Sequence, residues 1–322
     1  MILVAGSANL DFVVRAPHIP APGETVMGRD LALFPGGKGA NQAVACARAG
    51  NVPTHMLLAL GADGHAQPLE ASLHDAGVVM HIVRTPELAS GTAFICVSDD
   101  GENAITVAPG ANAALRPVDL AKHVPDLNGF SHLLLQLETP LDSVLAYAQA
   151  AQAAGLAVVL NAAPAQALPN ALLASVNWLI VNEAELCSVA ACNGNVAECL
   201  AQLDLPRLNV VVTLGGRGAC ARVDGRYLLQ PAFAVQPVDT TGAGDTFCGA
   251  LGAQLGAGVT PAVALQFACA AAAIACTRPG AQSAIPRHAE VQDFLRDKLQ
   301  QGAGPQSAFD SDLCTYCGIS TI

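Results

Sequence analysis

Short apolar runs alternate with helix-like patterns along most of the chain. The clearest apolar runs are predicted to be strands, at Ile2–Ala5 and at residues 55–60, 132–137, 156–160, 178–181 and 209–214. Each run is continuously apolar, as expected for a strand that helices cover on both faces. Helix-like stretches lie between them, for example at residues 40–49, 141–154 and 197–203. This alternation predicts an α/β fold of three layers, α/β/α, around a central, mostly parallel sheet.

Two regions interrupt this rhythm. Residues 12–35 and 78–108 contain extended segments separated by turn residues, with no helical pattern between them. Residues 78–84, 92–98 and 104–107 are predicted strands, and Asp100-Gly101 is a typical hairpin turn. We expect these pieces to form a small separate sheet, a lid that covers a site on the main domain. The main domain is expected to span residues 1–300.

Composition narrows the classes of partner. The chain has 322 residues, of which 52% are hydrophobic and 13% charged, and its formal net charge is −11. Bulk charge of this sign does not favour binding to nucleic acid or to an anionic membrane surface. We therefore expect neither partner, and any site for an anion must be built from backbone amides or a few placed cations.

The N-terminal residues show no signal-peptide pattern, because a buried strand is predicted to begin at once. No charged residue lies between Asp245 and Arg278, which invites a membrane interpretation. Gly256, Gly258 and Pro261 interrupt that stretch, so neither half reaches the ~20 apolar residues that a bilayer requires. Two Ala-rich helices inside a soluble core are the favoured interpretation.

The cysteines indicate a reducing compartment. Eleven cysteines without a secretory signal are typical of reduced thiols packed as small hydrophobic residues in the cytoplasm. Cys314 and Cys317 form a single C-x-x-C, for which a structural zinc or redox role is the minor alternative and an incidental pair the favoured one. They lie in a C-terminal tail, residues 301–322, that is expected to be weakly ordered.

The most informative polar segment runs from residue 238 to 247. Gly242-Ala243-Gly244 begins a predicted helix, and small residues there leave N–H groups that favour an anion. Asp245 stands beside this anion site, which suits a carboxylate that accepts a proton from a hydroxyl during phosphoryl transfer. The alternative is an acidic residue in the first turn for dipole reasons alone. Taken by itself, the segment leaves both interpretations open.

A second glycine-rich segment, Gly36-Gly37-Lys38-Gly39-Ala40-Asn41, is not a Walker A loop, because glycine follows the lysine. Its glycines can let a small polar ligand approach the backbone, or they can form an ordinary turn. Polar residues also follow several predicted strands, at the edge where open α/β sheets bind ligands. These residues are Asn9, Asp11, Glu138, Asn182, Glu185, Gly215 and Gly216.

At these residues the sequence resembles the ribokinase family of PfkB-type sugar kinases. The resemblance covers residues 1 to about 300, and the matching segments are residues 6–11, 36–42, 109–115, 136–138, 181–185, 213–218 and 239–245. It implies an ATP-dependent kinase that transfers the γ-phosphoryl group to the primary 5-hydroxyl of D-ribose. Another small furanose, such as deoxyribose or fructose, or a nucleoside such as pseudouridine is the alternative substrate. A non-catalytic sugar-binding regulator is the alternative of a different class.

The resemblance also implies roles for single residues. Asp245 would be the base, and the amides of Gly242, Ala243 and Gly244 would stabilise the transferred phosphoryl group. The implied sugar-binding residues are Asn9, Asp11, Gly37, Lys38, Asn41, Glu138 and Asp245. The implied residues for ATP and Mg²⁺ are Asn182, Glu185, Thr213, Gly215, Gly216, Gly218, Gly244 and Cys269. A potassium site would involve Asp239, Thr241, Ala275, Arg278 and Gly280.

Two positions depart from the family pattern. Ala284 replaces a frequent serine of the cation loop, which removes one potential oxygen ligand, and Cys269 replaces a frequent histidine beside the adenine. The last twenty or so residues match nothing in the family. The resemblance further implies that the lid excludes water from the reaction and pairs with a second subunit, so that a homodimer is expected.

Overall fold

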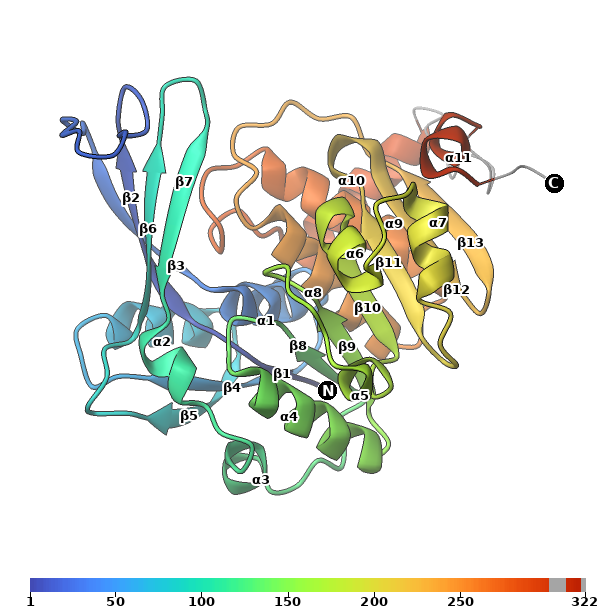
Figure 1. Cartoon of the computed structure of the whole chain (residues 1–322), viewed down its shortest axis with the longest axis horizontal. Coiled ribbons are helices and arrows are strands. Elements are labelled where there is room, and N and C mark those ends of the chain that lie inside the picture. The colour runs from blue at the N-terminus through green and yellow to red at the C-terminus, as the bar shows by residue number, and fades with distance from the viewer. Residues whose placement is uncertain (301–310, 320–322) are drawn as a thin grey trace.

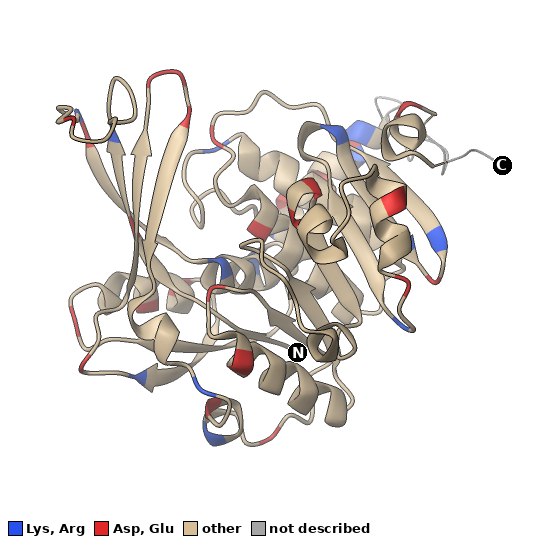
Figure 2. Ribbon diagram, in the orientation of Figure 1, with Lys and Arg blue, Asp and Glu red and all other residues tan. Residues whose placement is uncertain are grey.

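The computed structural model describes residues 1–300 and 311–319. A large sheet covered by helices forms the main body, and a small sheet projects from one side of it (Figure 1). This is the expected α/β architecture with a second, smaller sheet. Charged residues are found mostly in loops and at the ends of elements rather than along the buried strands (Figure 2).

The large sheet has nine strands in the order β13-β12-β11-β10-β9-β8-β1-β4-β5. Their bounds are β1 Ile2–Ala5, β4 Thr54–Leu60, β5 Val79–Arg84, β8 His132–Leu135, β9 Ala157–Asn161, β10 Trp178–Asn182, β11 Asn209–Thr213, β12 Gly218–Val223 and β13 Arg226–Pro231. Strands β5 to β11 in this order are parallel, and the β12–β13 hairpin is antiparallel. All six strands that the apolar runs predicted lie in the parallel part, so their carboxyl ends share one edge.

Helices cover both faces of this sheet. One face carries α1 Lys38–Arg48, α2 Ala66–Asp75, α8 Ala243–Gly256, α9 Pro261–Cys276 and α10 His288–Gln300. The other face carries α3 Asp119–His123, α4 Leu141–Ala153, α5 Asn170–Leu173, α6 Glu183–Ala190, α7 Val196–Gln202 and α11 Ser311–Cys317. Among the described residues there are also two short 3₁₀ turns, η1 Gly110–Ala114 and η2 Gly215–Arg217.

Two hydrophobic clusters, one on each face, form the core. Strand β1 shows the alternation: Ile2 and Val4 belong to one cluster, and Leu3 belongs to the other. All three side chains are buried, and each contributes about 1.5–3 kcal/mol by leaving water. A strand that is apolar on both faces is therefore explained by helices on both faces.

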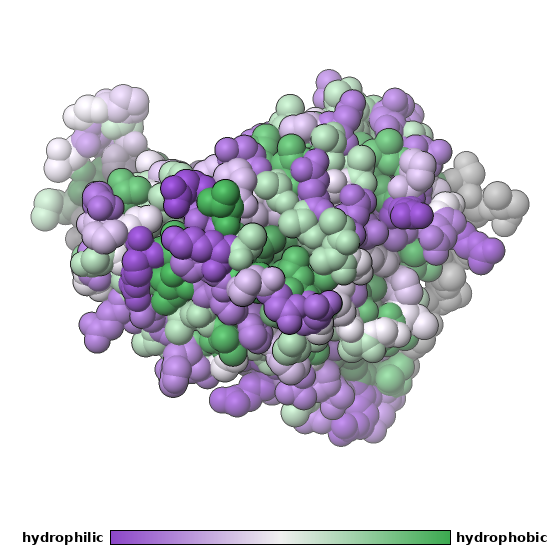
Figure 3. Space-filling view, turned by 90° about the horizontal axis from the view of Figure 1, so that it is seen from below, coloured by the Kyte–Doolittle hydropathy of each residue, from purple (hydrophilic) through white to green (hydrophobic). Residues whose placement is uncertain are grey.

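The Ala-rich stretch without charges forms α8 beyond Asp245 and the whole of α9, and both helices pack in the core as expected. Small residues let α8 approach its neighbours closely. A Cβ at Gly249 would lie 2.4 Å from the carbonyl oxygen of Gln42 in α1, and one at Gly252 would lie 3.0 Å from the side chain of Leu134. Within residues 1–300 and 311–319, no helix has the length and apolarity to cross a membrane. Hydrophilic and hydrophobic residues are mixed over the face seen in Figure 3.

The small sheet has the strand order β3-β2-β6-β7, with β2 Asn9–Arg15, β3 Leu31–Gly36, β6 Gly91–Val97 and β7 Asn103–Ala108. The expected hairpin turn at Asp100-Gly101 joins β6 to β7, and Gly101 has a φ of 87°. The sheet begins at Asn9 rather than at residue 12, so Asn9 and Asp11 belong to it.

One part of the predicted small sheet is corrected. Residues 78–84 were expected there, but β5 pairs in parallel with β4 at the edge of the large sheet. The reason is that α2 forms a crossover between β4 and β5, and a crossover helix places the next strand parallel to the first.

The tail prediction is also corrected where the structure describes it. Helix α11 is ordered against the body, and Leu313 and Cys317 are buried in the core cluster of its face. The remainder of the tail, residues 301–310 and 320–322, lies outside the described residues.

Candidate active site at the carboxyl edge of the sheet

Asp245 lies in the first turn of α8 and is almost fully buried, with 8% of its surface exposed. Asn41 donates a hydrogen bond from Nδ2 to Oδ2 of Asp245 over 2.9 Å, and Gln42 donates from Nε2 to Oδ1 over 3.1 Å. Both amides come from α1, more than 200 residues away along the chain. The two donors hold the carboxylate in one orientation at the start of the helix.

The glycine-rich start of α8 leaves room for a ligand. Gly242, the N-cap, has a φ of 72°, a conformation that favours glycine. Nothing lies within 4 Å of a Cβ built on Gly244, so its backbone faces open space. The N–H of Ala243 donates to the carbonyl of Thr240 over 3.2 Å, whereas the N–H of Gly244 has no backbone acceptor among the described residues. The helix N-terminus therefore offers an anion site beside Asp245.

A buried chain of amides supports Asp245 from behind, and the sequence did not reveal it. Gln136 donates to Oε1 of Gln42 over 2.7 Å, and Nε2 of Gln42 also donates to Oδ1 of Asn161 over 3.0 Å. Gln42 and Gln136 are each 1% exposed. Both residues belong to segments that match the family, but the sequence does not show that they contact each other, so neither was assigned a role.

Lys38 lies among carboxylates. Asp245 is the main influence that raises the pKa of Lys38, and Glu138 and Glu185 act in the same direction against burial, which lowers it. Glu138 is fixed by two donors to its Oε2 atom: the Ser7 hydroxyl over 2.6 Å and the backbone N–H of Lys38 over 3.1 Å. The charges of three predicted site residues therefore act on a fourth, Lys38.

Strand β2 brings Asp11 to the same place from the small sheet. Burial, followed by the charges of Glu138 and Asp245, raises the pKa of Asp11 to about 7. A Cβ at Gly36 would meet Oδ2 of Asp11 at 2.2 Å, and a Cβ at Gly37 would meet the backbone nitrogen of Asn9 at 2.6 Å. The glycines are therefore needed for β2 and the start of α1 to approach each other.

Asn9 is held by a residue without an earlier assignment. Asn112 in η1 donates from Nδ2 to Oδ1 of Asn9 over 2.8 Å and accepts from the N–H of Ala8 over 3.0 Å. The oxygen of Asn9 is therefore occupied, which leaves its NH₂ group for a ligand. Oδ1 of Asn41 is buried and has no partner among the described residues, so it can accept a hydrogen bond from a ligand hydroxyl.

Residues predicted for nucleotide and Mg²⁺ lie at the ends of β10 and β11. Asn182 and Thr213 are paired in register. Asn182 and Glu185 form a capping box at the start of α6, with two reciprocal hydrogen bonds of 2.8 Å. Burial raises the pKa of Glu185, and the charges of Lys38 and Asp245 also act on it. The end of β10 is thereby connected electrostatically to the Asp245 site.

The turn after β11 is open on one side. Cβ atoms built on Gly215 and Gly216 would meet nothing within 4 Å, whereas one on Gly218 would meet the carbonyl oxygen of Gln230 at 2.0 Å. Gly218 is thus a structural requirement of the β12–β13 hairpin. Cys269 is buried in α9, and burial raises the pKa of its thiol to about 12.

The five residues predicted for a potassium site come from two segments that Asp239 joins, the loop before α8 and the end of α9 with the loop after it. Its carboxylate accepts hydrogen bonds of 2.9 Å from the N–H groups of Thr241 and Gly280. Burial by itself would raise the pKa of Asp239, but these hydrogen bonds outweigh burial, and the net result is a lowered pKa. Arg278 directs its guanidinium to Glu290, and its N–H donates to the carbonyl of Ala275 over 3.1 Å. Asp239 thus fixes the two segments to each other through N–H donors from both.

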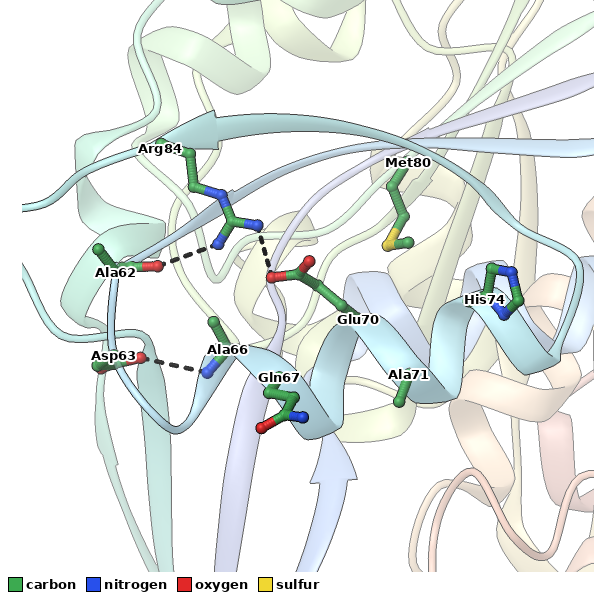
Figure 4. A pocket seen from close by; sticks show the side chains of 10 residues that line it. Ala62, Asp63, Ala66, Gln67, Glu70, Ala71, His74, Met80 and Arg84 are labelled. Carbon is green, nitrogen blue, oxygen red and sulfur yellow. Dashed lines mark hydrogen bonds and ion pairs between the residues drawn. The ribbon is translucent and has the colours of Figure 1, made fainter.

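A separate cavity of about 520 Å³ lies between α2 and β5 (Figure 4). Arg84 and Glu70 form an ion pair of 2.6 Å across it, and Met80 lines it from β5. None of the predicted site residues lines this cavity. The predicted site residues instead gather at the carboxyl edge of the sheet, where Asp245 at the start of α8 meets Asn41 of α1 and Asp11 of β2.

Comparison with known proteins agrees with this geometry. A model of the pfkB family carbohydrate kinases matches residues 1–288. The chain is 37% identical over 300 residues to a ribokinase from Haemophilus influenzae, covering 91% of this chain and 98% of the relative. The fold is similar to ribokinase from Thermotoga maritima, with a TM-score of 0.82, 35% identity and coverage of 92% and 99%. It is also similar to ribokinase from Arabidopsis thaliana in complex with ribose and ATP, with a TM-score of 0.85, 30% identity and coverage of 91% and 97%.

Proposed function

Because the chain belongs to the pfkB family of carbohydrate kinases, we propose that it transfers the γ-phosphoryl group of ATP to the 5-hydroxyl of D-ribose. The products are D-ribose 5-phosphate and ADP. The observation that carries the proposal is Asp245 fixed by two amides directly beside the glycine-rich start of α8. A base and an anion site are the two parts that this transfer requires of the protein.

Asp245 accepts the proton of the 5-hydroxyl as its oxygen attacks the γ-phosphorus. The bond between the γ-phosphorus and the bridging oxygen breaks, and ADP leaves with that oxygen. Negative charge on the transferred group is stabilised by the amides of Gly242, Ala243 and Gly244 at the N-terminus of α8. The first two amides border a sharp turn, while the third faces open space.

The ribose hydroxyls are bound by side chains from β2, from α1 and from the segment after β8. Glu138 and Asp11 accept hydrogen bonds, Asn9 donates, and Asn41 uses its free buried oxygen. Gly37 and Lys38 complete this set through the backbone that approaches β2. A sugar that lacks one of these hydroxyls leaves a buried hydrogen-bonding group of the protein without a partner. Each such group costs about 1–3 kcal/mol of binding free energy.

Nucleotide binding is assigned to the ends of β10 and β11. Thr213, Gly215, Gly216 and Gly218 lie along the nucleotide, and the helix around Cys269 lies beside the adenine. Asn182 and Glu185 hold Mg²⁺, whose role when bound is to neutralise phosphate charge. The residues fit this role, because Glu185 is a buried carboxylate within the electrostatic reach of Lys38 and Asp245.

A potassium ion is assigned to the loops that Asp239 joins. The ligand set is Asp239, Thr241, Ala275, Arg278 and Gly280, several of them through carbonyl oxygens. This site adjoins the N-cap of α8, because a Cβ at Gly242 would lie 3.1 Å from Ala281 in the second loop. A bound cation thus rigidifies the turn that carries the anion site.

The small sheet acts as the lid and as a dimer interface. Its strands expose large apolar side chains, including Leu31 at 65%, Phe94 at 53% and Ile105 at 55%. A second copy of the chain covers them, which removes the aggregation risk that exposed strands carry. We assign the enzyme to the cytoplasm, where ATP is available and its eleven cysteines stay reduced.

The test is a coupled assay of ADP release across D-ribose, deoxyribose, fructose and several nucleosides. The proposal expects kcat/KM to be highest for D-ribose, with product identified as ribose 5-phosphate. Preference for a nucleoside or another furanose would change the assigned substrate but keep the assigned reaction, phosphoryl transfer from ATP. Sugar binding without any ADP release would support a non-catalytic regulator instead.

A further inference from the structure

Helix α11 lies outside the region shared with the family, since the family model ends at residue 288 and α11 begins at Ser311. The helix nevertheless packs against the main domain. Leu313, Cys317 and Ile319 are buried in the core cluster of its face. The Cys317 thiol interacts with the Cys220 thiol of β12, and this interaction lowers the pKa of Cys317 and raises that of Cys220.

The exposed side of α11 carries a bridge between two turns. The Tyr316 hydroxyl donates to Oε1 of Glu183 over 2.7 Å. The guanidinium of Arg217 lies over the Tyr316 ring, with Cζ 4.2 Å from the ring centroid. Glu183 is the first residue of α6, and Arg217 ends η2. One side chain from the C-terminal helix therefore connects the turns that follow β10 and β11.

Both turns lead to the carboxyl edge of the sheet. Glu183 lies between Asn182 and Glu185, the two residues of the capping box, so its position is coupled to theirs. Glu185 interacts with the charges of Lys38 and Asp245. Arg217 follows Gly215 and Gly216, whose backbone faces open space. Movement of either turn would therefore change the surface available to a nucleotide, but not the sugar-binding residues on β2 and α1.

We propose that Tyr316 is a positioning residue for nucleotide binding, which acts by holding Glu183 and Arg217 in place. The proposal rests on the assigned ATP-dependent activity. It adds a contribution from a C-terminal helix beyond the matched family region. Tyr316 itself does not touch the reacting groups.

The experiment compares the parent with Tyr316→Ala, Tyr316→Phe and Thr315→Ala. Thr315 is exposed on the same helix, and its hydroxyl donates to the carbonyl of Ser311 over 2.8 Å, so its variant is the matched control. Steady-state KM for MgATP and for D-ribose are measured, together with the Kd of MgADP by calorimetry. A chain that ends after Gln300 provides a second way to remove the bridge, and its thermal midpoint reports whether it folds.

Tyr316→Ala is expected to raise the KM for MgATP and the Kd of MgADP about three- to tenfold, as loss of one hydrogen bond and one cation–π contact implies. The KM for ribose stays as in the parent. Tyr316→Phe keeps the ring and gives an intermediate effect, and Thr315→Ala gives none. The truncated chain shows at least the effect of Tyr316→Ala.

Parent-like MgATP and MgADP constants in Tyr316→Ala would overturn the inference, as would equal losses for ribose and MgATP, which would indicate general destabilisation. These failures differ from failure of the proposed function. A parent that binds MgADP but phosphorylates no sugar would refute the kinase assignment, while the MgADP measurements would still test Tyr316. A parent that does not bind MgADP would refute both.

Discussion

Gln42 in α1 and Asp245 in α8 are joined by a hydrogen bond of 3.1 Å that closes a buried chain of amides. Because the carboxylate accepts from the Gln42 amide nitrogen, the oxygen of Gln42 must face the other way, where it accepts from Gln136 over 2.7 Å. The orientation of each amide is thus fixed by the next. This arrangement connects the proposed base to Gln136, which follows β8 in the centre of the sheet.

Replacement of Asp245 by Asn should reduce kcat by at least ~10²-fold, the scale expected for removal of a general base. Asn has nearly the same size, so the KM for ribose should change little. The measurement is steady-state kinetics with ribose and MgATP. Turnover equal to that of the parent would show that Asp245 is not the base.

Gln42→Leu should lower kcat about tenfold, because Oδ1 of Asp245 loses the donor that orients it. The same change leaves the amide of Gln136 and the oxygen of Asn161 without a partner, which should cost about 1–3 kcal/mol of folding free energy. Kinetics and denaturant unfolding measure the two effects. An unchanged kcat in a folded, destabilised variant would mean that Gln42 is purely structural.

Glu138→Gln is a sharp test of the sugar site. Ser7 and the Lys38 backbone both donate to one oxygen of Glu138, so a glutamine can keep both hydrogen bonds while it loses the charge. The KM for ribose should rise at least ~10-fold, as for loss of a charged hydrogen-bond acceptor, with the KM for MgATP unchanged. Asp11→Ala should likewise weaken ribose binding. If the ribose KM is unaltered in both variants, the site is assigned wrongly.

Asp11 should make the free protein less stable as the pH rises. Its pKa is about 7 in the folded state against an ordinary value of 3.8, so the folded state holds the proton more tightly. Relative to Asp11→Asn, the parent should therefore lose stability between about pH 4 and pH 7 and change little above that. The difference should reach roughly 2–4 kcal/mol in denaturant unfolding at pH 8. A difference that does not depend on pH would contradict this electrostatic account.

Potassium should activate the enzyme relative to sodium at equal ionic strength. The expectation follows from the Asp239 loops, whose ordering is coupled to the N-cap of α8. Ala284 contributes no side-chain oxygen, so activation depends on Asp239 and backbone carbonyls. Initial rates in the two salts provide the measurement, and identical rates would refute the cation site.

The sequence by itself determined the central strands and predicted at which edge of the sheet the candidate site residues lie. A strand such as Ile2–Ala5 is apolar on both faces, which is possible only under two layers of helices, and the pattern is therefore local information. Likewise, Gly242, Gly244 and Asp245 are neighbours in the chain, so one segment predicts an anion site beside a carboxylate, while the role of the carboxylate stays open at that level.

Only the tertiary structure decided features that depend on distant residues. Three such features are the edge position of β5, the hydrogen bond from Gln42 to Asp245, and the hydrogen bond from Tyr316 of α11 to Glu183. In each of them, the contact is between segments that are separate in the chain. An amide or a tyrosine has no fixed role until its partner is known, because many positions can satisfy the same hydrogen bond. Local patterns encode local elements, whereas the pairing of elements is selected by how the whole chain packs.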